Sequence, residues 1–195
     1  MTSGRPLAYD PDTALEAAMQ VFWLHGYEAT SLQDLLRAMG LSKSSFYQAF
    51  GSKKELFLRC VNRYCDKLAE LLRGQLAAAA GGLDFIEQRL LDAAAEAQCR
   101  KLRRGCMLMS TANELAQKDL SIAGRVDSGF AGLREIFAEA VRRGQTEGTI
   151  TTEQTTDSLA DFLICNIGGI KTLVKGGADE ARVREIVAVI LRGLL

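Results

Sequence analysis

The polar side chains between residues 43 and 48 are of the types that read DNA. A helix that enters the major groove must present short polar groups to the base edges while its other side packs on its own domain. Gln48 carries an amide that can bond adenine in bidentate fashion, a contact that discriminates between bases by roughly 1–3 kcal/mol. We expect base-edge contacts from Lys43, Ser44, Ser45 and Gln48.

Cys106 is a second residue with a reactive group. It follows Arg103, Arg104 and Gly105 and opens a predicted helix, and nearby cations and helix-terminal amides favour a thiolate. Such a thiolate would sense oxidants or electrophiles, with a mixed disulfide, a sulfenic acid or a bond to a nearby amine such as Lys171 as its first product. A buried cysteine can equally be an inert small hydrophobe, so both interpretations stay open.

Other reactive chemistry is not indicated. His25 is the single histidine and no cysteine pair has CxxC spacing, so we expect no metal site and no cofactor. The chain also lacks a histidine-centred triad and a glycine-rich phosphate loop, so we do not expect an enzyme. We expect the remaining cysteines to be reduced packing residues: Cys60, Cys65, Cys99 and Cys165.

The elements that position these groups are helices. Prolines occur only at Pro6 and Pro11, helix formers dominate the rest, and no strand pattern is present. Apolar periodicity and capping signals predict an all-α fold of about nine helices. Their expected ranges are 12–25, 30–39, 43–50, 52–74, 84–101, 106–116, 121–147, 153–175 and 179–194.

The segment from Thr30 to Phe50 predicts two short helices joined by a glycine turn. Thr30 and Gln33 have the spacing of a capping box, and Ser42 is the expected N-cap of the next helix. Phe46 and Phe50 are four residues apart, so both should pack on the head core behind the polar face. A solvated helical hairpin without DNA contacts is the alternative.

Composition limits the function. Of the 195 residues 48% are apolar and 25% charged, and no apolar run is long enough for a membrane span. Gly4, Arg5, Asp10 and Asp12 break up the start of the chain, so no export signal is expected and the location should be cytoplasmic. Lys and Arg number 24, as do Asp and Glu, so any DNA contact must be local and a DNA-compacting protein is disfavoured.

The stretch from Gly26 to Phe57 resembles the DNA-binding head of the TetR family of transcriptional regulators. It reads G-Y-E-A-T-S-L-Q-D-L-L-R-A-M-G-L-S-K-S-S-F-Y-Q-A-F-G-S-K-K-E-L-F. The resemblance implies a homodimer that binds a palindromic operator, expected to be a repressor, and that a small-molecule or thiol-reactive inducer releases from DNA. The alternative is an all-helical enzyme or a small-molecule-binding protein without DNA binding.

The resemblance also implies roles for particular segments. Residues 1–57 would form a three-helix helix-turn-helix domain and residues 58–195 an effector-binding and dimerisation domain. Tyr47 and Lys53 match the family's phosphate-contacting tyrosine and lysine, and Thr30 is expected as a further DNA contact. The short run from Gly105 to Leu108 resembles the NemR-like branch, in which a cysteine at this point reacts with oxidants or electrophiles.

Two sets of apolar residues in the second domain follow from the family pattern. Broad apolar stripes on the last two helices would be overexposed in a monomer, although they could instead complete the monomer's own core. The expected dimer interface is Leu159, Leu163, Ile167, Ile170, Val183, Ile186, Val187 and Ile190. The expected effector pocket is Met107, Leu108, Phe130, Phe137 and Phe162, all of which could equally be ordinary core residues.

Overall fold

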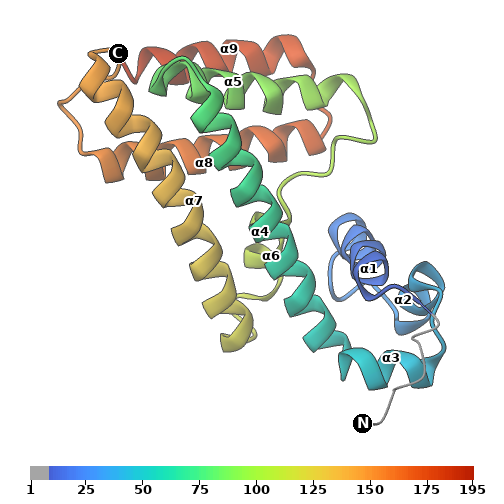
Figure 1. Cartoon of the computed structure of the whole chain (residues 1–195). Coiled ribbons are helices and arrows are strands. Elements are labelled where there is room, and N and C mark those ends of the chain that lie inside the picture. Colours follow the sequence, from blue (N-terminus) through green and yellow to red (C-terminus); the bar gives the residue numbers. More distant parts are fainter. Residues whose placement is uncertain (1–8) are drawn as a thin grey trace.

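The computed structural model describes residues 9–195, and over that range its regular elements are all helices, joined by turns and loops (Figure 1). The first eight residues of the predicted 1–57 domain, including Gly4 and Arg5, lie outside the described residues. The all-α prediction is therefore confirmed for the described part. In chain order its helices are α1 (Pro11–His25), α2 (Leu32–Met39), α3 (Lys43–Phe50), α4 (Lys53–Ala78), α5 (Gly82–Ala95), the 3-10 turn η1 (Glu96–Gln98), α6 (Met107–Leu115), α7 (Leu120–Glu147), α8 (Thr156–Lys175) and α9 (Glu180–Arg192).

The start of α2 differs from the prediction by one residue. Ser31 is the N-cap, its hydroxyl accepts from the Asp34 amide at 3.1 Å, and the Asp34 carboxylate closes the capping box. The predicted box of Thr30 and Gln33 is therefore wrong. Thr30 is only 1% exposed, and its hydroxyl instead donates to the Gly26 carbonyl at 2.6 Å.

Two helix ends also differ. α4 continues through Gly74 to Ala78, past the predicted end at residue 74. α5 ends at Ala95, short of the predicted Lys101, and turns occupy the chain up to Arg104. The Arg103 side chain holds this loop by donating its Nε–H to the Ala97 carbonyl at 3.0 Å.

The helices enclose two hydrophobic cores that lie along the length of α4 and α7 (Figure 1). One core joins α1, α2 and α3 to α6 and to the neighbouring ends of α4 and α7. The other core lies among α5, α8, α9 and the opposite ends of α4 and α7. Leu68 and Leu133 are half-buried side chains that pack against both cores, so they mark the junction between them.

The crossing of α5 and α7 is close enough to require glycine. A Cβ atom at Gly82 would lie 2.1 Å from the Ala140 carbonyl oxygen and 2.4 Å from the Gly144 amide nitrogen. Both neighbours are backbone atoms, so they cannot turn aside as a side chain could. The Gly82 amide also donates to Glu147 at 2.9 Å, which ties the start of α5 to the end of α7.

No helix of the described residues has the length and apolar character needed to cross a membrane.

Candidate nucleic-acid interface and internal cavity

The orientation of α3 is fixed from both its start and its buried side. The Ser42 hydroxyl accepts from the Ser45 amide at 3.1 Å, as predicted for the N-cap. Phe46 and Phe50 are buried in the core that joins α3 to α1 and α4, which confirms the prediction that they anchor this helix. Ala49 is half-buried against the same core, and the exposed side chains of α3 are Lys43, Ser44, Tyr47 and Gln48.

The outward face of α3 is polar. Lys43, Ser44 and Gln48 are exposed, and Ser45 is half-buried, with its hydroxyl 2.9 Å from the capping hydroxyl of Ser42. Tyr47 is 47% exposed. The predicted contact residues of α3 thus share one accessible surface, backed by the two phenylalanines.

Lys53 is the first residue of α4 and lies beside this surface. Its ammonium nitrogen is 4.3 Å from the centre of the Tyr27 ring, a cation–π contact that holds the charge at a helix N-terminus. Thr30 does not belong to the same surface. Its side chain is buried and its hydroxyl is already bonded to Gly26, so the expectation that it contacts DNA is not retained.

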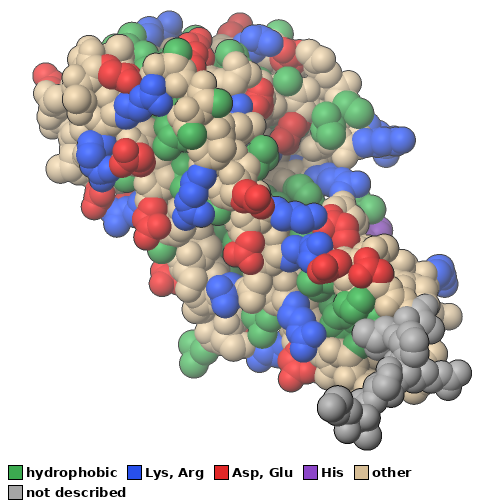
Figure 2. Space-filling view, in the orientation of Figure 1, with side chains coloured by type: hydrophobic (Ala, Val, Ile, Leu, Met, Phe, Trp, Pro, Cys, Tyr) green, Lys and Arg blue, Asp and Glu red, His purple; other side chains and the backbone are tan. Residues whose placement is uncertain are grey.

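On the face shown in Figure 2, charge is not concentrated in one broad patch. On the face shown in Figure 2, Lys and Arg side chains alternate with Asp and Glu side chains over the middle of the molecule. This pattern agrees with the zero net charge of the chain. A nucleic-acid contact must therefore depend on the local geometry of α3 and Lys53.

Polar contacts attach the three-helix head to the rest of the molecule. The Glu114 carboxylate on α6 accepts from the backbone amides of Tyr27 at 3.0 Å and Glu28 at 2.7 Å. Lys54 pairs with Asp119 at 2.5 Å, and the hydrogen bond from Lys54, followed by that from Ser121, lowers the pKa of Asp119 below its ordinary value. The head is thus connected to both α6 and the start of α7.

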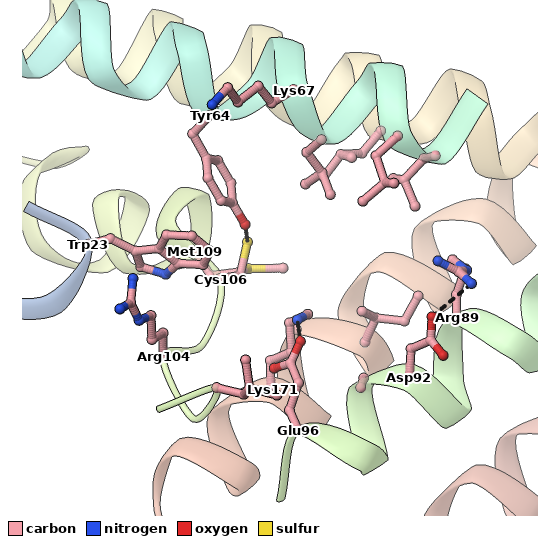
Figure 3. A pocket seen from close by; sticks show the side chains of 18 of the residues that line it. Trp23, Tyr64, Lys67, Arg89, Asp92, Glu96, Arg104, Cys106, Met109 and Lys171 are labelled. Carbon is pink, nitrogen blue, oxygen red and sulfur yellow. Dashed lines mark hydrogen bonds and ion pairs between the residues drawn. The ribbon is translucent and has the colours of Figure 1, made fainter. Parts of the chain in front are cut away.

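A cavity of about 650 Å³ lies at the junction of the two cores (Figure 3). Its walls come from α1 and from α4 to α8, together with the loop between η1 and α6. Trp23 and Tyr64 lie on one side, and their rings meet edge to face with 5.0 Å between centres. Since Trp23 belongs to α1, the head itself forms part of the cavity wall.

Three ion pairs lie on the cavity wall. Glu16 of α1 pairs with Lys67 of α4 at 2.5 Å, and Asp92 pairs with Arg89 at 2.8 Å within α5. Glu96 of η1 pairs with Lys171 of α8. Each of these residues lines the cavity, so all three acidic side chains of the wall are neutralised by basic neighbours.

Cys106 also lies on this wall, at the N-cap position of α6. The Tyr64 hydroxyl donates to its sulfur at 3.5 Å, and burial together with the adjacent thiol raises the pKa of Tyr64. Two arginines were expected to favour a thiolate at Cys106, but both donate hydrogen bonds to other groups. Arg103 donates to the Ala97 carbonyl and Arg104 donates to the side-chain oxygen of Gln20. Lys171 lines the same cavity as Cys106, but its ammonium pairs with Glu96.

The predicted pocket residues mostly lie elsewhere. Phe137 lines the cavity, whereas Met107 and Leu108 are buried in the core shared with the head. Phe130 packs against that same core, and Phe162 is 39% exposed on α8. The wall residues that the sequence analysis missed include Trp23 and Tyr64, which periodicity alone assigns to ordinary helix packing.

The predicted dimer interface is largely internal. Six of its eight residues are buried within the single chain, and the other two, Ile167 and Ile186, are half-buried. The stripes therefore face α5 and α7, in line with the alternative that they complete the monomer's own core. The buried six are Leu159, Leu163, Ile170, Val183, Val187 and Ile190.

The opposite faces of α8 and α9 carry exposed apolar side chains instead. Phe162 is 39%, Leu173 37% and Val189 59% exposed.

Cys165 is exposed on the same helix as Phe162, and Cys99 is exposed in the loop after η1. The prediction that these two cysteines are packing residues is wrong. Cys60 is buried, as expected for a packing residue. Cys65 is half-buried, and burial raises the pKa of its thiol to about 11.

Comparison with known proteins gives a consistent set of relatives. The family model for bacterial regulatory proteins of the tetR family matches residues 14–60, and the model for the tetracyclin repressor-like C-terminal domain matches residues 82–190. The HTH-type transcriptional repressor ComR of Escherichia coli (strain K12) is 33% identical over 198 residues, covering 97% of this chain and 90% of ComR.

Solved structures agree with these relatives. A cysteine mutant of the TetR family transcriptional regulator CifR, complexed with 26-bp double-strand operator DNA, superposes with a TM-score of 0.86 at 29% identity, covering 98% of this chain and 100% of that chain. The reduced form of E. coli NemR has a TM-score of 0.83 at 18% identity over 92% of this chain and 93% of that chain, which shows a shared fold.

Proposed function

This chain belongs to the TetR family of bacterial regulatory proteins, and on that premise we propose that it is a dimeric transcriptional repressor released from its operator by a small molecule. The observation that carries this function is the outward polar face of α3, backed by the buried Phe46 and Phe50. A helix held in this way can enter the major groove without rearranging its own support.

We assign two kinds of DNA contact. Lys43, Ser44, Ser45 and Gln48 would meet base edges, because they lie on the accessible face of α3. Tyr47 and Lys53 would bind phosphates and so set the position of the helix. These contacts need no broad basic surface, because a dimer doubles a small number of phosphate contacts.

The second copy would bind to the outer faces of α8 and α9. Phe162, Leu173 and Val189 are exposed there in the single chain, and a dimer would remove them from water. Two heads related by a two-fold axis match the symmetry of a palindromic operator. This assignment replaces the buried residues of the original prediction.

The cavity is the proposed inducer site. It lies between the head and the body, so a molecule inside it contacts α1 and α4 together. Cys106 offers a second route to release, because a thiol-reactive molecule that enters the cavity reaches its sulfur. We keep residues 1–57 as the proposed DNA-binding domain and residues 58–195 as the proposed effector-binding and dimerisation domain, with α4 running across the boundary. A regulator of transcription would work in the cytoplasm.

The test begins with selection of bound fragments from the source genome. A discrete operator is expected, bound far more tightly than random duplex. Tyr47→Ala and Lys53→Ala should weaken binding to operator and random DNA alike. Lys53→Ala should also reduce the slope of log affinity against log salt concentration by about one, the amount expected for one lost phosphate contact. Gln48→Ala should cost about 1–3 kcal/mol on the operator only.

Arg73→Ala is the matched control, because it removes one charge from an exposed position of α4 that lies outside the interface. It should bind like the wild type. A protein that preferred no duplex over heparin or random oligonucleotides would leave the alternative, a helical enzyme or a ligand-binding protein that does not bind DNA.

A further inference from the structure

We propose that the cavity binds an organic anion, an apolar molecule with one carboxylate or sulfonate group that pairs with Arg104. The regulatory consequence of this binding rests on the proposed function, but the binding itself does not. The inference comes from three properties of the wall, namely its apolar surface, its balance of charge, and the position of Arg104 next to the head.

Most of the wall is apolar. Leu68 and Leu133 lie at the junction of the cores, and Phe137, Ile164 and Ile167 continue the surface on α7 and α8. Trp23 and Tyr64 add two aromatic rings. A space of about 650 Å³ with such walls favours a largely apolar ligand of drug-like size.

The charges of the wall do not balance. Glu16, Asp92 and Glu96 each pair with a basic residue, as described above. Lys101 and Arg104 also line the cavity, and within residues 9–195 neither has an acidic partner. Two positive charges are therefore left for a ligand, and they lie on the same loop.

The contacts of Arg104 are all with neutral groups. Its Nε–H donates to the Lys101 carbonyl at 3.2 Å, another N–H donates to the side-chain oxygen of Gln20, and the guanidinium lies 5.7 Å from the centre of the Trp23 ring (Figure 3). A carboxylate or sulfonate is a stronger acceptor than an amide oxygen, and it accepts two parallel N–H groups from arginine. An anion in the cavity would therefore compete with Gln20 for Arg104.

That competition bears on the head. Gln20 and Trp23 both belong to α1, and the Trp23 Nε1–H donates to the Gly105 carbonyl at 3.1 Å, next to Arg104 in the chain. These bonds connect the loop before α6 to the head. An anion that draws Arg104 away from Gln20 removes one of them and so alters how α1 is held.

Two fluorescent probes test the charge requirement directly. 8-Anilinonaphthalene-1-sulfonate is an apolar anion, and N-phenyl-1-naphthylamine has the same ring system without the sulfonate. Trp23 is the only tryptophan of the chain, so energy transfer from Trp23 to either probe reports binding close to the cavity wall. Titration of the full-length dimer without DNA gives an affinity for each probe.

Arg104→Gln should lower the affinity for the sulfonate about tenfold, the usual scale of one lost charge-assisted contact, and leave the affinity for the neutral probe unchanged. Arg100→Gln removes a charge from an exposed position of the same loop that does not line the cavity, so both affinities should match the wild type. Gln20→Ala should raise the affinity for the sulfonate several-fold, because it removes the competing acceptor.

The gain of affinity in Gln20→Ala cannot result from poor folding. Equal losses for the two probes in Arg104→Gln, or equal losses of sulfonate binding in Arg104→Gln and Arg100→Gln, would overturn the proposal. Absence of probe binding in the wild type would overturn it too. Because these titrations contain no DNA, a failure here is distinguishable from a failure of operator binding.

Discussion

At the scale of single residues, the setting of Cys106 decides what chemistry it can do. Its sulfur accepts a hydrogen bond from Tyr64 and it lines the cavity, so a small electrophile has access to it. Arg103 and Arg104 donate hydrogen bonds to the Ala97 carbonyl and to Gln20 rather than to this sulfur. Any reaction of Cys106 would therefore depend on which molecules enter the cavity.

Cys106→Ser should preserve operator binding and abolish release by N-ethylmaleimide. The physical reason is that serine keeps the size of the side chain and removes the nucleophile. Gel shifts before and after treatment, with mass spectrometry to locate the adduct, measure both properties. Cys99→Ser and Cys165→Ser are the controls, because these exposed thiols also react but lie outside the cavity. Release that persists in Cys106→Ser would end its role as a sensor.

At the scale of elements, α4 connects the two functional regions. Its 26 residues begin at Lys53 in the proposed DNA interface and pass Tyr64, Lys67 and Leu72 on the cavity wall. A helix of this length moves nearly as a unit, so a shift at the cavity end displaces Lys53. The close crossing of α5 and α7 limits how far the other side of the body can follow.

Gly82→Ala should destabilise the protein by about 1–3 kcal/mol, because its Cβ would meet the backbone of α7 and force the two helices apart. Gly74→Ala provides the matched comparison within a helix, since nothing lies within 4 Å of its Cβ position. That variant should gain about 0.5–1 kcal/mol from helix propensity. Urea unfolding of the two variants measures the difference, and equal stabilities would contradict the crossing geometry.

At the scale of the whole molecule, the two cores meet at the cavity. The helices α8 and α9, which carry the exposed Phe162, Leu173 and Val189, lie in the part of the molecule away from α1–α3 (Figure 1). The proposed ligand site and the proposed dimer surface thus lie on different parts of the same body. In the proposed mechanism the distance between two heads would depend on both, because the dimer would fix the bodies and a ligand in the cavity would adjust each head against its body.

Phe162→Glu should convert the dimer into a monomer and lose operator binding at the same protein concentration, because it places a charge in the proposed interface. Leu120→Glu is the control, an equally drastic change at a side chain that is 90% exposed at the start of α7. Light scattering after size exclusion gives the mass, and circular dichroism checks the fold. If Phe162→Glu remained dimeric, the interface would have to lie elsewhere.

The sequence by itself determined the helices, the Ser42 cap and the buried side of α3, because these depend on neighbours three and four residues apart. It also carried the family motif over Gly26–Phe57. The expected dimer interface shows where such local patterns stop being informative. Periodicity shows that a face of α8 or α9 is apolar but not whether α5, α7 or a second copy covers it, and six of the eight residues expected at the interface are buried within the single chain.

The cavity could be found only in the tertiary structure. Its wall joins Trp23, Tyr64, Arg104 and Lys171, which lie on different segments of the chain and share no local pattern. The surroundings of Arg104 depend on how the loop between η1 and α6 packs against α1. That packing forms only when the head and the rest of the chain come together. Local sequence rules describe one helix at a time, whereas a site between helices exists only once all of them have packed.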